Sequence, residues 1–124
     1  RRYPLDYIEV DYSVGTRSAE ERILPLAQER RMAVLANTPF GGRRGAASTF
    51  AAVEGKELPG WAAEIGASSW AQVFLKYVVS HPAVTAAIPG TTRVTHLLDN
   101  QGAGKGRLPD TAIRRQIEQF WDTL

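Results

Sequence analysis

Residues 88–93, with the sequence IPGTTR, place several anion-binding groups in one short turn ahead of an expected helix. Free N–H groups at a helix N-terminus and the positive end of the helix dipole favour a phosphate. The hydroxyl groups of Thr91 and Thr92 and the guanidinium of Arg93 would add further donors. An ordinary threonine-rich helix cap is the other interpretation, and the residues alone favour neither.

A second segment of this kind covers residues 37–45, with the sequence NTPFGGRRG, and follows an apolar run. Glycines let a ligand approach the backbone closely, and Arg43 and Arg44 would be able to hold phosphates. A solvated surface loop explains the same residues. The tract is too short to favour contact with RNA.

The apolar residues of the chain predict an alternation of strands and helices. Each of the three expected strands is short and buried, and they cover residues 5–10, 32–36 and 83–88. Helices are expected from a capping box at Ser18 and Glu21, with a kink or a restart at Pro25, over residues 61–65, after a cap at Ser69, over residues 93–100, and after a cap at Asp110.

Strands without polar alternation, each followed by a helix, indicate a parallel sheet covered by helices, as in α/β barrels or doubly wound sheets. Three strands cannot close a barrel, because the eight-stranded form takes about 250 residues. We therefore interpret residues 1–124 as one partial domain of three βα units and a trailing helix. The chain begins without Met and enters a strand pattern at once, so we expect a fragment.

Composition narrows the classes of function. The 124 residues are 44% hydrophobic and 23% charged, with a net charge of +2, which gives no bulk attraction to nucleic acid. No apolar run is long enough for a membrane span. The absence of cysteine excludes disulfides and Cys-ligated metals, and we expect a cytoplasmic protein without a metal site.

The segments of the chain resemble, in their order and spacing, those of bacterial aldo-keto reductases. This resemblance implies the C-terminal half of a (β/α)8 TIM barrel that binds NADPH and, in the intact protein, reduces a small carbonyl substrate. The matching segments are DYS at 11–13, AVLANTPFGG at 33–42, SWAQVFLKY at 69–77, SHPAV at 80–84, IPGTT at 88–92 and DN at 99–100.

The resemblance implies contacts with the nicotinamide and pyrophosphate parts of the cofactor. Glu9 stands where many members have a Gln that binds the carboxamide, and its carboxylate can still accept the amide N–H. Asn37 stands where many members have a Tyr that stacks on the nicotinamide. The loop along the pyrophosphate corresponds to Thr38, Pro39, Phe40 and Gly41.

The resemblance also implies a site for the adenosine end of the cofactor. Thr91 and Thr92 match the residues at the 2′-phosphate, and Asn100, with Asp99 before it, matches the position that recognises the adenine.

Two residues depart from that pattern, which makes NADH the alternative cofactor. Gly90 and His96 stand where many members have a Lys and an Arg, and Arg93 is expected to compensate. A solvent-facing helix residue is the other interpretation of His96. His81, before a proline at a helix end, is expected to be structural.

Family members use a Tyr, a Lys, an Asp and a His for catalysis, and all four belong to the first four strands. The resemblance therefore assigns no catalytic residue to this chain. Tyr77 is expected in the core, and Asp11 and Tyr12, which close a strand, are candidates for substrate contact. The alternative function is a non-enzymatic half-barrel that binds nucleotide, or that assembles with itself or with a missing N-terminal half.

Overall fold

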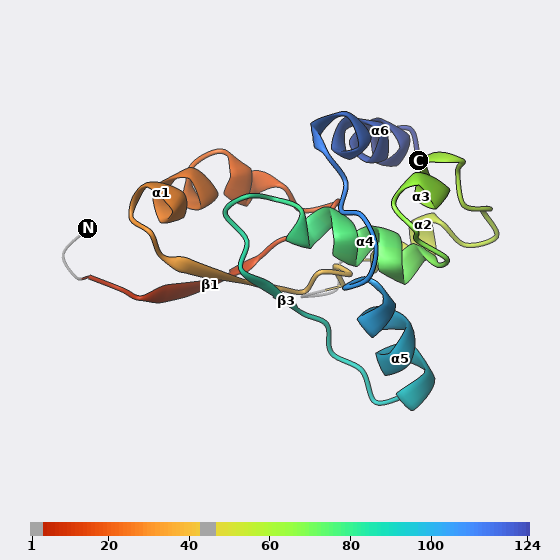
Figure 1. Ribbon diagram of the computed structural model, residues 1–124, viewed down its shortest axis with the longest axis horizontal. Coiled ribbons are helices and arrows are strands. Elements are labelled where there is room, and N and C mark those ends of the chain that lie inside the picture. The colour runs from red at the N-terminus through yellow and green to blue at the C-terminus, as the bar shows by residue number, and fades with distance from the viewer. Residues whose placement is uncertain (1–3, 43–46) are drawn as a thin grey trace.

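The computed structural model describes residues 4–42 and 47–124, whose centre is a three-stranded parallel sheet (Figure 1). The strands lie in the order β1-β2-β3, and Asp11 pairs with Asn37, which pairs with Ile88. This arrangement confirms the predicted partial α/β barrel. The strands are β1 (Tyr7–Asp11), β2 (Ala33–Asn37) and β3 (Ala86–Ile88).

Figure 1 shows α1, α4 and α6 on one face of the sheet, while α5 lies on the other side of the β3 end. Helix α2 was not predicted, because its four residues are too few for a visible apolar period. The helices are η1 (Ser18–Glu20), α1 (Ile23–Glu29), α2 (Thr49–Ala52), α3 (Trp61–Glu64), α4 (Trp70–Val79), α5 (Val94–Gly102) and α6 (Thr111–Asp122).

Two predicted caps are confirmed and one is wrong. The Ser69 and Asp110 side chains accept hydrogen bonds from the backbone N–H groups of Gln72 (3.1 Å) and Ile113 (3.0 Å). The expected capping box at Ser18 is instead a three-residue 3-10 helix, and α1 begins later without a side-chain cap. Pro25 therefore lies in the first turn of α1, where it removes no helical hydrogen bond, and the chain restarts a helix after η1 instead of kinking one.

The two faces of the sheet differ in burial, which corrects the prediction of strands buried on both sides. Val34 and Ala36 are fully buried under the helices, and Ile8 and Val10 pack against the same core. On the opposite face, Tyr7 is 64% exposed, because no described element covers it. β1 therefore alternates like a strand of a sheet with one covered face.

Helix α4 is the central element of the core, with seven consecutive buried residues from Gln72 to Val78. Among them is Lys76, whose Nζ donates hydrogen bonds to the backbone carbonyls of Lys105 (2.5 Å) and Arg107 (3.1 Å). These bonds tie α4 to the loop between α5 and α6. Within the described residues, no helix is long and apolar enough to cross a membrane.

Candidate functional site

A pocket of about 370 Å³ lies where the start of α4, the turn after β3 and helix α5 meet. Residues from α2 and from the loop after β2 complete its wall. Six of the residues predicted for cofactor binding line this pocket, although they come from three separate parts of the sequence. The lining residues are Phe40, Phe50, Ser69, Trp70, Ala71, Gly90, Thr91, His96, Asp99 and Asn100.

The position of α5 in this pocket depends on Asp99. Its carboxylate accepts hydrogen bonds from Ser69 Oγ (2.7 Å) and from Gln72 Nε2 (2.8 Å), both at the start of α4. The neighbouring Asn100 is 9% exposed, and its side chain makes no hydrogen bond within the described part of the chain. Asp99 thus holds α5 against the start of α4, while the side-chain amide of Asn100 is available to a ligand.

The turn after β3 is ordered by Thr91, whose hydroxyl accepts a hydrogen bond from the Arg93 N–H at 3.2 Å. A Cβ at Gly90 would meet no atom within 4 Å, so this position is open to a ligand. Thr92 and Arg93 are exposed and lie outside the pocket lining, and α5 begins one residue later than expected. The structure therefore brings Gly90 and Thr91 to the pocket, and leaves Thr92 and Arg93 beside it.

The loop after β2 holds Phe40 against the pocket. Gly41 N–H donates to the carbonyl of Thr38 (2.8 Å), and both residues have positive φ angles, +65° and +48°. The Thr49 backbone N–H and hydroxyl both donate to the Phe40 carbonyl, at 2.9 and 3.1 Å. These hydrogen bonds hold the turn both within itself and against Thr49. A turn held in one conformation can position a ligand.

The remaining predicted residues lie in two smaller hollows or in the interior. Thr38 and Gly41 line a hollow next to Asp11, while Glu9 and Asn37 line a shallow one on the uncovered sheet face. Pro39 is buried. The phosphate-binding role expected of Arg43 and Arg44 lies outside the described residues.

Two aromatic residues of the pocket, Phe50 and Trp70, were not predicted there. Trp70 was interpreted as core from its place on the apolar stripe of α4, and its ring does stack on Phe74 and Phe120. Phe50 lies on α2, for which the sequence carries no periodic signal, and it contacts Phe40 at 4.9 Å between ring centroids. The place of Phe50 in the pocket is visible only from its tertiary contact with Phe40.

The amino-acid sequence of the chain also matches a known protein family. Residues 1–122 match the model of the aldo/keto reductase family. The chain belongs to the aldo-keto reductase family. No sequence among the curated proteins matches it significantly.

Solved aldo-keto reductases have the same fold over part of their length. One described as thermostable, in complex with the inhibitor epalrestat, is 26% identical, with a TM-score of 0.69 over 95% of this chain and 40% of that chain. One from Klebsiella pneumoniae in complex with NADPH is 21% identical, with a TM-score of 0.63 over 93% of this chain and 39% of that chain. An apo enzyme from Bacillus halodurans is 18% identical, with a TM-score of 0.67 over 95% and 44%.

These matches also define how much of a solved aldo-keto reductase the chain represents. The 124 residues span about 40% of the length of the structures they match. The parallel sheet and its helices are the corresponding part of the α/β barrel.

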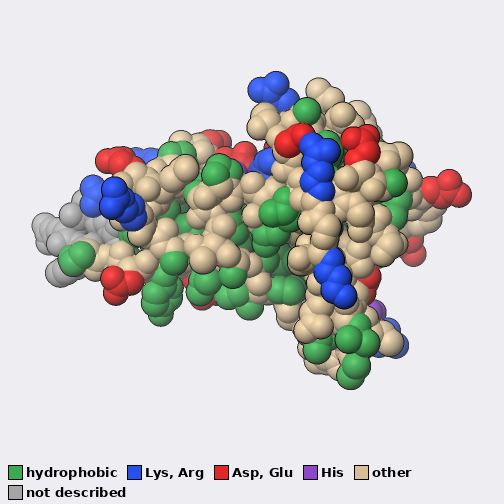
Figure 2. All heavy atoms as spheres, in the orientation of Figure 1, with side chains coloured by type: hydrophobic (Ala, Val, Ile, Leu, Met, Phe, Trp, Pro, Cys, Tyr) green, Lys and Arg blue, Asp and Glu red, His purple; other side chains and the backbone are tan. Residues whose placement is uncertain are grey.

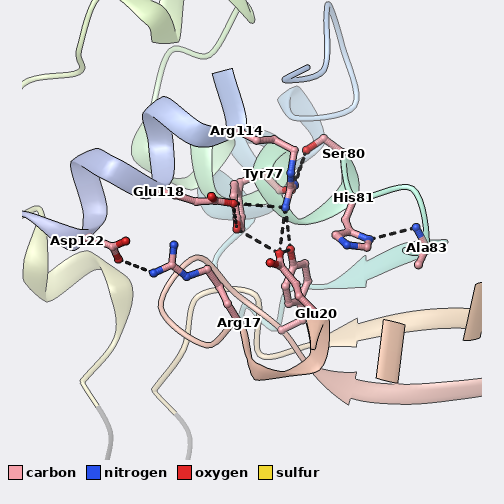
Figure 3. Close-up of polar contacts among 10 residues, drawn as sticks. Arg17, Glu20, Tyr77, Ser80, His81, Ala83, Arg114, Glu118 and Asp122 are labelled. Carbon is pink, nitrogen blue, oxygen red and sulfur yellow. Dashed lines mark hydrogen bonds and ion pairs between the residues drawn. The ribbon is translucent and has the colours of Figure 1, made fainter. Parts of the chain in front are cut away.

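Two tyrosines of this aldo-keto reductase chain are enclosed in a polar network (Figure 3). Tyr12 Oη donates to Glu20 and accepts from Arg114 Nη2 (2.9 Å), and Tyr77 Oη donates to Glu118 (2.8 Å). Burial, more than any other cause, raises the pKa of both phenols. The substrate contact considered for Tyr12 is therefore wrong, because its side chain is fully buried, and the core position of Tyr77 is confirmed.

His81 has the structural role that its sequence context predicted. Its Nδ1 accepts a hydrogen bond from the Ala83 N–H at 3.1 Å and shapes the turn before β3. Burial lowers the pKa of its imidazole, which favours the neutral, accepting form. This turn also explains why β3 starts at Ala86, later than predicted.

Proposed function

We propose that this chain binds NADPH, with NADH as the weaker alternative, as the cofactor-binding part of an aldo-keto reductase. The intact enzyme would transfer hydride from the nicotinamide to a small carbonyl substrate in the cytoplasm. The observation that carries this proposal is the pocket, which gathers Phe40, Gly90, Thr91 and Asn100 from distant segments. Among the structural relatives, one from Klebsiella pneumoniae was solved with NADPH.

The three hollows suggest how an extended dinucleotide would lie on the chain. The adenosine end would occupy the pocket beside Asn100, and the pyrophosphate would pass the locked turn at Thr38 and Gly41. The nicotinamide would reach Glu9 in the middle of β1, where the carboxylate can accept an amide hydrogen. Parallel strands bring their C-terminal ends to one edge, which is where α/β folds bind ligands.

The proton donor for the carbonyl would come from another part of the intact protein. A phenol acts near neutral pH only when a neighbour lowers its pKa. Tyr12 and Tyr77 have raised pKa values and occupied hydroxyl groups. We expect the 124-residue chain with NADPH and an aromatic aldehyde to turn over at background rate, and steady NADPH oxidation by chain of verified mass would contradict this.

Cofactor binding can be tested by fluorescence titration with NADPH. Replacing Asn100→Ala removes an amide that faces the pocket without a protein partner, and we expect affinity to fall about five- to tenfold. Gln101→Ala is the matched control, since Gln101 is an exposed amide on the same helix outside this pocket. Equal affinity in both variants, or no NADPH binding by the unmodified chain, would overturn the proposal.

A further inference from the structure

The shallow hollow on the uncovered face of the sheet carries two carboxylates. It has a volume of about 350 Å³ and is lined by Glu9, Val10, Asp11 and Asn37. Glu9 and Asp11 are two residues apart on β1, so both side chains leave the strand on this face. Asn37 pairs with Asp11 in the register of β1 and β2 and adds a neutral amide. The described lining of this hollow therefore carries negative charge and no positive charge.

The carboxylate of Glu9 is exposed, and no neighbour neutralises it within residues 4–42 and 47–124. It makes no hydrogen bond or ion pair with another side chain in those residues. Asp11, by comparison, accepts a hydrogen bond from the Thr38 hydroxyl at 3.2 Å. An ionised carboxylate accepts hydrogen bonds and carries a negative charge. Glu9 therefore offers both an acceptor and a charge to a ligand in the hollow.

We infer that Glu9 makes this site favour the oxidised cofactor, NADP⁺, over the reduced cofactor, NADPH. The inference rests on the proposed function, because it concerns the nicotinamide that would occupy the hollow. The oxidised nicotinamide ring carries a positive charge and the reduced ring is neutral, whereas the carboxamide and the phosphates are the same in both forms. The carboxylate therefore attracts only the oxidised ring, and its hydrogen bond with the carboxamide favours neither form.

The expected effect is that of two exposed charges of opposite sign. At a separation of about 4–6 Å in water-like surroundings, their attraction changes an affinity by about three- to fivefold. We define the preference for the oxidised form as the Kd of NADPH divided by the Kd of NADP⁺. Glu9 should raise this preference by the same factor, and added salt should reduce it, because salt screens exposed charges. In the intact enzyme, the NADP⁺ left by carbonyl reduction would then act as a product inhibitor.

The experiment is a fluorescence titration with NADPH, followed by displacement of the bound NADPH with NADP⁺, at neutral pH and low ionic strength. Glu9→Gln has nearly the same shape and keeps an oxygen that accepts the carboxamide hydrogen, so the substitution removes only the charge. Glu29→Gln is the matched control, because Glu29 is an exposed carboxylate at the end of α1, on the other face of the sheet (Figure 1). NADH and NAD⁺ form a second pair that differs in the same ring.

The outcomes separate the two proposals. A preference for NADP⁺ that is about three- to fivefold lower in Glu9→Gln than in the unmodified chain and in Glu29→Gln supports the role of Glu9. The same preference in all three chains, or an equal loss in both variants, overturns that role and leaves the proposed function standing. A preference of the unmodified chain that does not fall with added salt also contradicts it. Absence of binding by every dinucleotide overturns the proposed function itself and the inference with it. Thermal melts show whether each variant is folded, as expected for exchanges at exposed positions.

Discussion

At the scale of single residues, the packing of α6 depends on the hydrogen bonds that the Arg114 guanidinium donates. Its Nη1 donates to Ser80 Oγ (2.8 Å) and to the Tyr77 carbonyl, and its Nη2 donates to Tyr12 Oη (2.9 Å) and Glu20 (3.1 Å). The guanidinium also lies 4.2 Å from the centre of the Tyr77 ring. One side chain thus satisfies polar groups from three elements.

Replacing Arg114→Met should lower the free energy of unfolding by about 2–3 kcal/mol, because Tyr12 and Glu20 lose their cationic partner in a poorly hydrated place. The neighbouring Arg115 is exposed, and Arg115→Met should change the free energy by less than about 0.5 kcal/mol. Urea denaturation measures both values. Equal losses in the two variants would show that Arg114 has no special role.

Because of Tyr12 and Tyr77, we expect the free energy of unfolding to fall as the pH becomes alkaline. Their pKa values are raised in the folded state, mainly by burial, so the folded chain retains protons that the unfolded chain releases above about pH 10. The stabilisation is complete below that pH and falls as the pH rises. We expect phenolate absorbance from these two residues to arise together with unfolding measured by circular dichroism. Their ionisation in a chain that stays folded would contradict the burial.

At the scale of elements, the contact between α6 and the loop after β1 is unusually close. A Cβ built on Gly15 would lie 2.8 Å from Trp121 Cζ2, a distance that real contacts do not show. Trp121 in turn packs edge-on against Phe74 at 6.1 Å between ring centroids. The loop can accept α6 only because Gly15 has no side chain.

We therefore expect Gly15→Ala to destabilise the chain by about 1–3 kcal/mol, since the rigid indole of Trp121 must move. Gly60→Ala is the control, because its Cβ would meet no atom within 4 Å and its φ of −56° suits any residue. This variant should be neutral or slightly stabilising. Thermal denaturation compares them, and equal melting temperatures would contradict the close approach.

At the scale of the whole molecule, one face of the sheet and part of α5 expose apolar side chains. Figure 2 shows hydrophobic groups along the lower side, under the strands and on α5. Val94 is 71% exposed, Leu98 63% and Ile88 43%. β1 and β3 also each leave one edge unpaired within the described residues. Such surfaces and edges promote association.

The chain should therefore self-associate at micromolar concentration, or bind the remainder of a barrel if one is supplied. Light scattering measures this, and we expect Val94→Glu with Leu98→Glu to increase the monomer fraction. Leu124→Glu, at the 46% exposed C-terminal residue, is the control and should have little effect. A stable monomer with a cooperative melt in the unmodified chain would contradict the expected association.

The open edge of β1 around Ile8 and Val10 would make such a contact through its backbone, because both side chains pack against the core under the helices. Tyr7 and Glu9 lie on the uncovered face instead. The unpaired backbone of β1 and the side chain of Tyr7 are therefore the expected contact.

The amino-acid sequence by itself determined the order of the strands and of the helices other than α2, the caps at Ser69 and Asp110, and the family. These features depend on neighbours three or four residues apart, or on motifs in a fixed order, and such relations are visible along a chain. The partial barrel followed from the alternation of short apolar runs with helices. The structure confirms the parallel sheet that this alternation predicted.

Only the tertiary structure decided which predicted residues share a pocket and which sheet face is covered. Phe40, His96 and Asn100 come together because α4 and α5 are joined through Asp99, a contact between residues about thirty positions apart. Tyr12 lost its candidate role for the same kind of reason, since Arg114 closes over it from the far end of the chain. Burial and long-range hydrogen bonds depend on how elements pack, and local patterns carry little of that information.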